Sequence, residues 1–109
     1  MTALSGPALE PQQDDVKNLV IIFHGYGADG ENLIDLGQAW SSLLPNTAFV
    51  APNGLNPCEM GFGYQWFSLE EKTPELVQER LNGILESVSS YVLSQAKHYN
   101  VPLSRVALV

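Results

Sequence analysis

Three short stretches of the chain are hydrophobic at every position. Residues 19–23 read Leu-Val-Ile-Ile-Phe, residues 48–51 read Ala-Phe-Val-Ala, and residues 106–109 read Val-Ala-Leu-Val after Arg105. Unbroken runs of branched and aromatic residues are typical of strands buried on both faces, as in a parallel sheet covered by helices. The pattern therefore predicts three central strands, the third beginning at Arg105 and continuing to the last residue.

Between the first two runs, the hydrophobic positions follow a helical period. Asp29 can cap a helix N-terminus, and Glu31 lies in the first turn, where the helix dipole favours an acid. The positions that recur at steps of three and four are Leu33, Leu36, Trp40, Leu43 and Leu44. We expect a helix that starts after Asp29 and ends at Pro45, with Trp40 in the core.

A longer stripe precedes the third run. It starts at Thr73-Pro74-Glu75, which combines a capping hydroxyl, a proline at the first helical position and an acid in the first turn. The hydrophobic residues that follow at steps of three and four are Val77, Leu81, Ile84, Leu85, Val88, Val92, Ala96 and Tyr99. They predict a helix of roughly seven turns that ends near Asn100.

The order strand, helix, strand, helix, strand predicts an α/β layered fold with parallel pairing. A chain of 109 residues can form one domain at most. Residues 1–17 are rich in Pro, Gln and Asp and predict a loose lead-in that holds one short edge strand. The segment between Gly54 and Thr73 shows no period and predicts a long loop, which in a compact domain tends to be functional.

Charge and composition exclude several classes of function. The net charge is −7, and the five basic residues are scattered, so we expect no nucleic-acid partner. The same sign repels anionic lipids, and the longest hydrophobic run is far shorter than a membrane span, so we expect no stable membrane insertion. The start of the chain lacks a signal peptide, and Cys58 has no partner for an internal disulfide. Both features favour a cytoplasmic location.

The stretch from His24 to Gly30, which reads His-Gly-Tyr-Gly-Ala-Asp-Gly, carries two competing motifs directly after the first run. Its three glycines have the spacing of a dinucleotide-binding turn. That turn needs an acid at the end of the second strand to hold the ribose, and Ala51-Pro52-Asn53 supplies none. Asp29 would also stand where the pyrophosphate must bind, which places like charges together.

The second motif in this stretch is His-Gly-x-Gly, which is typical of an oxyanion loop in hydrolases. Glycines on either side of Tyr26 allow a tight turn, so that the Tyr26 N–H can point into a cleft and donate to an oxygen that gains negative charge during acyl transfer. A plain tight turn after a strand would show the same glycines. On these few residues alone, both interpretations stay open.

The whole pattern resembles the phospholipase/carboxylesterase family of α/β-hydrolases, which includes bacterial carboxylesterases and acyl-protein thioesterases. The resemblance rests on residues 19–54, on Tyr64-Gln65-Trp66-Phe67-Ser68-Leu69, and on the ending Val-Pro-Leu-Ser-Arg-Val-Ala-Leu-Val. It implies that Tyr26 supplies an oxyanion-hole N–H. It also implies that Trp66 and Phe67 lie near the acyl-binding cleft, and that His24, Gly25 and Gly27 belong to the substrate-binding loop.

Family members continue from the third strand into a Gly-x-Ser-x-Gly turn that carries the nucleophile, and place the catalytic acid and base later. None of these is present in residues 1–109. The resemblance therefore implies the N-terminal portion of a single α/β-hydrolase domain, cut in a central strand before the nucleophile elbow and inactive by itself. We also expect self-association through the truncated sheet edge, because an unpaired apolar edge pairs readily.

The remaining candidate residues point to structural roles. His24 is expected to hold the strand end rather than act as a general base, and His98 near a helix C-terminus is expected to face water. Two histidines with no third ligand do not predict a metal site, and no cofactor is expected. Nothing near Cys58 suggests an activated nucleophile.

Three hypotheses follow from the sequence. In the first, the chain is part of a serine carboxylesterase or thioesterase that cleaves a small acyl ester or thioester through an acyl-enzyme. In the second, it is a non-catalytic binding or interaction module, a split or degenerate hydrolase. In the third, it is a dinucleotide-binding domain.

Overall fold

The structure is a computed structural model that describes residues 4–11 and 15–109. Its main sheet has the strand order β1-β3-β2-β6, in which β2 pairs in parallel with both β3 and β6, and β1 is an antiparallel edge strand beside β3. These strands are β1 (Ala8–Leu9), β2 (Asn18–Ile21), β3 (Thr47–Val50) and β6 (Val106–Leu108). The predicted α/β fold with parallel strands is confirmed, and β1 is the short edge strand expected in the lead-in. The third predicted central strand, β6, instead lies at the other edge of the sheet, and two of its three residues are exposed.

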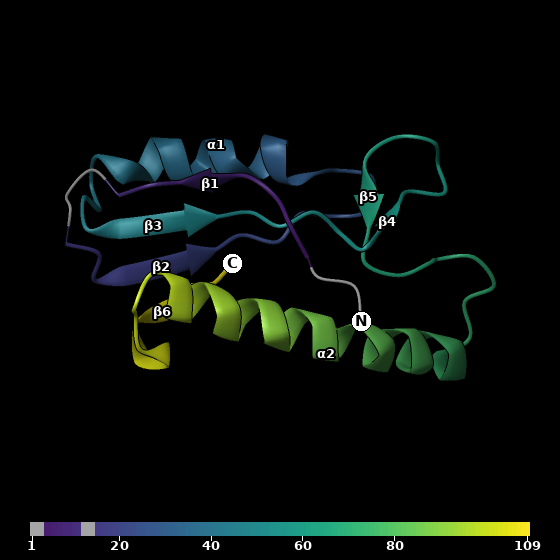
Figure 1. Ribbon diagram of the computed structural model, residues 1–109. Coiled ribbons are helices and arrows are strands. Elements are labelled where there is room, and N and C mark those ends of the chain that lie inside the picture. Colours follow the sequence, from purple (N-terminus) through teal and green to yellow (C-terminus); the bar gives the residue numbers. More distant parts are fainter. Residues whose placement is uncertain (1–3, 12–14) are drawn as a thin grey trace.

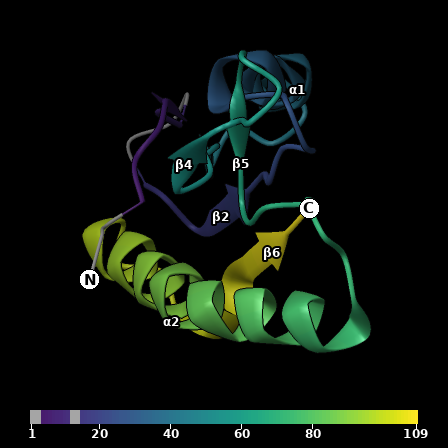
Figure 2. The same ribbon diagram turned by 90° about the vertical axis from the view of Figure 1, so that its right-hand side faces the viewer.

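Two helices cover opposite faces of this sheet. Figure 1 shows α1 (Gly30–Ser41) on one side of the strands and α2 (Pro74–His98) on the other, and the perpendicular view in Figure 2 keeps them on opposite sides. After α2 the chain passes through a short 3-10 turn, η1 (Leu103–Arg105), and enters β6. Because β2 and β3 are parallel, their carboxyl ends lie at the same end of the sheet, where the loops that follow them can meet.

Alternation along β2 and β3 divides the core into two layers, because successive side chains of a strand point to opposite faces. The cluster on the α2 side consists mainly of Leu19, Ile21, Ala48, Val50, Tyr91 and Ala96. The cluster on the α1 side consists of Ile22, Ile34, Phe49 and Ala51, with Val20 and Trp40 packed against it. Both strands are thus buried on both faces, as their unbroken hydrophobic runs predict.

The helix starts agree with the sequence. The Asp29 side chain accepts a hydrogen bond from the Asn32 N–H at 2.9 Å and caps α1. The Thr73 hydroxyl accepts one from the Leu76 N–H at 3.2 Å, and Pro74 opens α2. These side chains satisfy N–H groups that have no carbonyl partner inside the helix.

The face that α1 buries differs from the predicted one. Ile34 and Gly37 are buried, whereas Leu36 is 39% exposed. A Cβ at Gly37 would lie 2.8 Å from the Phe49 side chain, so glycine allows α1 to pack closely against β3. Leu43 and Leu44 lie beyond the end of α1 and are exposed, because the helix ends at Ser41 rather than at Pro45.

The segment predicted as one long loop contains a small hairpin. β4 (Asn56–Pro57) and β5 (Tyr64–Gln65) pair antiparallel and form a separate two-stranded sheet. Two-residue strands are too short to show a period, so no pattern in the sequence predicts them. Figure 1 shows this hairpin at the end of the main sheet, beyond the start of α1.

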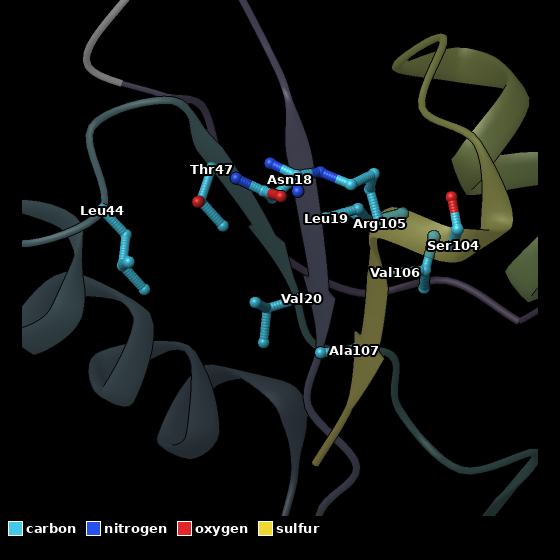
Figure 3. Close-up of a pocket in the computed structure, with 9 residues that line it drawn as sticks. All are labelled: Asn18, Leu19, Val20, Leu44, Thr47, Ser104, Arg105, Val106 and Ala107. Atoms are coloured by element: carbon cyan, nitrogen blue, oxygen red, sulfur yellow. The ribbon is translucent and has the colours of Figure 1, made fainter.

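The sheet has an open edge at β6. One side of β6 pairs with β2, and its other side meets no strand among the described residues. A hollow of about 370 Å³ lies over the neighbouring strands and is lined by residues from β2, β3, η1, β6 and the turn after α1 (Figure 3). At the end of β6, Leu108 and the following Val109 are more than half exposed.

We predict that the isolated chain self-associates through β6 and that Leu108→Lys weakens this association. A lysine on an edge strand opposes pairing with another chain, because its charge cannot be buried there. The matched control is Leu93→Lys on α2, since Leu93 is 56% exposed and Leu108 is 58% exposed. Light scattering should show a lower apparent mass for Leu108→Lys only. An equal effect of both substitutions would mean that general hydrophobicity, and not the strand edge, causes association.

Candidate active site

The loop that follows β2 begins with a buried histidine whose ring is fully hydrogen-bonded. His24 Nε2 accepts a hydrogen bond from the Gly54 N–H at 2.8 Å, and Nδ1 lies 2.6 Å from the Gly25 carbonyl oxygen. Because Nε2 must be an acceptor, these partners assign the neutral ring with its proton on Nδ1. His24 therefore joins the loop after β2 to the loop after β3, in the structural position expected for it.

Trp66 holds the other side of His24. The two rings stack with their centroids 4.9 Å apart, and the indole N–H donates to the His24 carbonyl oxygen at 2.9 Å. Phe23 packs edge-on against the same indole at 5.6 Å. Trp66 thus fixes the carboxyl end of β2, a role that the sequence did not reveal.

Residues 25–28 form a β-turn, closed by the Ala28 N–H, which donates to the Gly25 carbonyl at 3.1 Å. Gly27, third in the turn, has φ of 81°, the left-handed value that a type II turn requires. Gly25 has no such φ, and a Cβ there would meet no atom within 4 Å. Of the two glycines that flank Tyr26, backbone geometry therefore requires only Gly27.

Tyr26 occupies the second position of this turn, where a type II turn uses no N–H. Accordingly, its amide donates to no backbone carbonyl of the described residues, while the amides of Gly27 and Ala28 on its C-terminal side are both bonded. The amide predicted to act in an oxyanion hole is thus not tied up inside the backbone. It lies in the loop that leaves the carboxyl end of a central strand, where ligands bind in open α/β sheets.

The β4–β5 hairpin fixes this turn from outside. The Gly27 N–H donates to the Tyr64 carbonyl at 3.0 Å, and the Tyr64 N–H donates to the Ala28 carbonyl at 2.8 Å. Gly63 has φ of 69°, and a Cβ on it would collide with the Gly27 carbonyl. The hairpin therefore lies so close to the turn that only glycine fits at position 63.

The phenol of Tyr26 reaches the segment between the two hairpin strands. Burial raises the pKa of Tyr26 above its ordinary value, and a hydrogen bond to the Glu59 carboxylate raises it further. The pKa of Glu59 is lowered, chiefly because the Ser68 hydroxyl donates to its carboxylate at 2.6 Å. Glu59 is therefore an acceptor whose charged form is stabilised by the Ser68 hydroxyl.

The N-terminus of α1 has no room for a phosphate. The Gly30 N–H donates to the Asn53 side-chain oxygen at 2.7 Å, and Asp29 occupies the Asn32 N–H. A Cβ on Gly30 would collide with the Ala51 carbonyl, so this third glycine serves helix packing. The donors that a pyrophosphate would need are already used, which removes the support for a dinucleotide site.

Comparison with known proteins agrees with this geometry. Residues 4–109 match the model of the phospholipase/carboxylesterase family. The chain belongs to this family. It is 27% identical over 93 residues to Esterase YpfH of Escherichia coli strain K12, covering 85% of this chain and 40% of that protein. It superposes on the crystal structure of esterase PE8 with a TM-score of 0.89 and 33% identity, covering 98% of this chain and 51% of that one.

This chain thus spans about half the length of the esterases it matches. Its fold is the corresponding part of an α/β-hydrolase, as the sequence predicted. The candidate residues predicted for this family lie together at the carboxyl ends of β2 and β5: His24, Gly25, Tyr26 and Gly27 on the turn, Trp66 against His24, and Phe67 beside Trp66. A hollow of about 100 Å³ is lined by Tyr26, Trp66, Phe67 and Leu69.

Sequence reasoning missed the residues that hold the turn from other loops. Asn53 and Gly54 bind Gly30 and His24, and Glu59 binds Tyr26. A signal for the first two exists, because Pro52-Asn53-Gly54 ends β3 at the same edge of the sheet as the turn after β2. No pattern points to Glu59, which pairs with Tyr26 only once the hairpin has formed.

Two further residues, Cys58 and His98, were considered in the sequence analysis as a nucleophile and as a metal ligand. Cys58 is buried, and His98 is exposed at the end of α2. Within residues 4–11 and 15–109, no three potential ligands gather as a metal site would need. No helix in the described part of the chain has the length and apolar character to cross a bilayer.

We predict that Gly63→Ala separates the hairpin from the turn. Both strain at a positive φ and the clash with Gly27 oppose alanine there, and together they should cost more than 2 kcal/mol, against about 1 kcal/mol for strain alone. Gly61 is the matched control, because its φ is 100° but a Cβ would meet no atom within 4 Å. Urea unfolding measures both variants. Equal losses of stability would show that the close approach costs nothing.

We predict that His24→Phe lowers the free energy of unfolding by about 1–3 kcal/mol, because the buried Gly54 N–H loses its acceptor while the aromatic ring is kept. His98→Phe, at an exposed position, is the control and should change stability by less than about 0.5 kcal/mol. The comparison uses thermal or urea unfolding of both variants. An unfolding energy of His24→Phe equal to that of the parent would contradict the role assigned to His24.

Proposed function

We propose that this chain forms the oxyanion-hole side and part of the acyl cleft of a serine carboxylesterase or thioesterase. The observation that carries the proposal is the Tyr26 N–H, which makes no backbone hydrogen bond within residues 4–11 and 15–109 and lies in a type II turn at the carboxyl end of central strand β2. Membership of the family and the likeness to an esterase structure support the same chemistry.

In the proposed reaction, a serine outside these 109 residues gives its proton to a histidine base and bonds to the carbonyl carbon of the substrate. The carbonyl oxygen then gains the electron pair of the broken π bond. The Tyr26 N–H donates to that oxygen and stabilises its charge. Collapse of this intermediate expels the alcohol or thiol with a proton, and water releases the acid from the acyl-enzyme by the same route.

Residues 1–109 contain no Gly-x-Ser-x-Gly motif. We therefore propose that the isolated chain has no esterase activity and that its contribution appears only beside a nucleophile. A fluorophosphonate probe, which labels activated serines, should leave the isolated chain unlabelled. Labelling at a serine of this chain would contradict this assignment of roles.

The decisive test is Tyr26→Pro in a hybrid enzyme in which residues 1–109 replace the matched half of esterase PE8. Proline suits the second position of a type II turn, so it removes the N–H without disturbing the turn. We expect kcat/KM for p-nitrophenyl butyrate to fall by about 10²–10³. Tyr26→Ala, which keeps the N–H, is the control for loss of the side chain and should retain most of the activity.

Unfolding curves and circular dichroism should show that both variants fold like the parent hybrid. Full activity of a folded Tyr26→Pro variant would contradict the proposal. If the hybrid does not fold, the isolated chain still provides a test by NMR. The Tyr26 amide should then shift when a neutral carbonyl compound is added, and an unchanged amide would count against its role as donor.

A further inference from the structure

Two adjacent residues in the loop after β3, Asn53 and Gly54, are hydrogen-bonded to both ends of the segment that carries the Tyr26 turn. On the N-terminal side of the turn, the Gly54 N–H donates to His24 Nε2 at 2.8 Å. On its C-terminal side, the Asn53 side-chain oxygen accepts from the Gly30 N–H at 2.7 Å. The turn at residues 25–28 therefore lies between two contacts that neighbouring residues of another loop provide.

The contact between Asn53 and Gly30 ties the start of α1 to the end of β3. The first N–H groups of a helix have no carbonyl partner inside the helix and are usually satisfied by a nearby side chain. In α1 the local cap, Asp29, accepts from the Asn32 N–H. The Gly30 N–H is bonded instead to a residue 23 positions away in the sequence. The C-terminal side of the turn is thus fixed to the sheet through the Asn53 side chain.

Asn53 is itself hydrogen-bonded to the segment before β1. Its N–H donates to the Ser5 carbonyl at 2.8 Å, and the Ala51 N–H donates to the Pro7 carbonyl at 3.0 Å. These two bonds extend the antiparallel pairing of β1 with β3 into the loop. A Cβ on Gly6 would collide with the Ala51 carbonyl, so the two backbones are in direct contact.

The other end of this segment is anchored in the core. Leu4 is buried in the cluster on the α2 side, together with Tyr91 and Ala96. Figure 1 shows the chain before β1 crossing the end of the sheet toward α2. Residues 4–7 therefore connect the core on the α2 side to the loop that holds the Tyr26 turn.

We propose that Asn53 is a positioning residue for the Tyr26 amide and that residues 4–7 brace it. This inference rests on the proposed function, because the direction of the amide matters to catalysis only if it donates to the substrate oxygen. The Tyr26 N–H makes no backbone hydrogen bond within the described residues, so its direction depends on how its segment is held. An oxyanion donor is effective when it is aimed before charge develops, and small displacements reduce the rate.

The test is ¹⁵N relaxation of the Tyr26 amide in the 109-residue chain, which gives the order parameter of its N–H bond. All variants carry Leu108→Lys to limit self-association. For the parent we expect a rigid value of about 0.85. Asn53→Ala removes the acceptor of the Gly30 N–H, and we expect the Tyr26 value to fall to about 0.6. Asn53→Asp keeps a side-chain oxygen at this place and should restore the parent value.

Asn46→Ala is the matched control. The Asn46 side chain also makes a hydrogen bond to a residue distant in sequence, donating to the Asp15 carbonyl at 2.7 Å. Asn46 precedes β3, whereas Asn53 follows it, so the two residues lie at opposite ends of the sheet. The order parameter of the Tyr26 N–H in Asn46→Ala should equal that of the parent.

Gly6→Ala tests the brace and leaves Asn53 in place. The added methyl group must push the segment before β1 away from Ala51, so the Ser5 carbonyl moves away from the Asn53 N–H. We expect the Tyr26 order parameter to fall in the same direction as in Asn53→Ala, by a smaller amount. If Asn53→Ala does not fold, Gly6→Ala decides, and an unchanged Tyr26 value there would overturn the inference.

In the hybrid with esterase PE8, loss of positioning should act on the chemical step. We expect Asn53→Ala to lower kcat by about tenfold and to change KM for p-nitrophenyl butyrate by less than about twofold, because a misdirected donor weakens transition-state stabilisation more than substrate binding. Asn53→Asp should recover most of the loss. Asn46→Ala should show none.

The outcomes separate this inference from the proposed function. An unchanged Tyr26 order parameter in folded Asn53→Ala would mean that the hairpin alone holds the turn, and the inference would be overturned. Equal falls in Asn53→Ala and Asn46→Ala would point to a general loss of stability and overturn it as well. A fall in order parameter that leaves kcat of the hybrid unchanged would support positioning by Asn53 and contradict the catalytic role of the Tyr26 amide.

Discussion

The candidate site depends on hydrogen bonds that join three loops at one end of the sheet. The turn after β2 is held by the loop after β3 through Gly54 and His24, and by the β4–β5 hairpin through Gly27, Ala28 and Tyr64. Each of these hydrogen bonds is short and directional, so the loops must be in direct contact before any of the bonds can form. Buried backbone groups left without these partners would destabilise the whole cluster, which makes the arrangement cooperative.

The type II turn explains how one amide stays available in a region where its neighbours are bonded. A turn of this type closes with the N–H of its fourth residue, and the hairpin engages the N–H of its third. The N–H of the second residue, Tyr26, has no backbone acceptor among the described residues. The geometry of the turn causes this, rather than a defect in packing. A donor that is fixed before the reaction begins needs no reorganisation when charge develops, which is the basis of oxyanion stabilisation.

The central strands and both helices could be predicted from the sequence, because hydrophobic runs and helical periods mark elements that pack against a core. The stripe predicted on α2 is only partly correct, since Leu85 is 50% exposed while Ser87 and Tyr91 are buried. The caps at Asp29 and Thr73 and the central strands β2 and β3 follow from this pattern. The buried face of α1 did not, because Gly37 packs against Phe49 by having no side chain, which a hydrophobic stripe cannot reveal. The sequence predicted only the part of the candidate site that lies on the contiguous motif from His24 to Gly27 and on the neighbouring Trp66 and Phe67. The pairings of Tyr26 with Glu59 and of His24 with Gly54 span about thirty residues and exist only in the folded chain.

A carboxylate near the proposed oxyanion hole would ordinarily oppose catalysis, because it repels the charge that develops on the substrate oxygen. Glu59 avoids much of this cost through its position and its partners. Its carboxylate accepts hydrogen bonds from the Ser68 hydroxyl at 2.6 and 3.0 Å, which stabilise the negative charge without removing it. The lowered pKa of Glu59 reflects these donors. Glu59 is also exposed, so the surrounding solvent screens much of the field that reaches the Tyr26 amide.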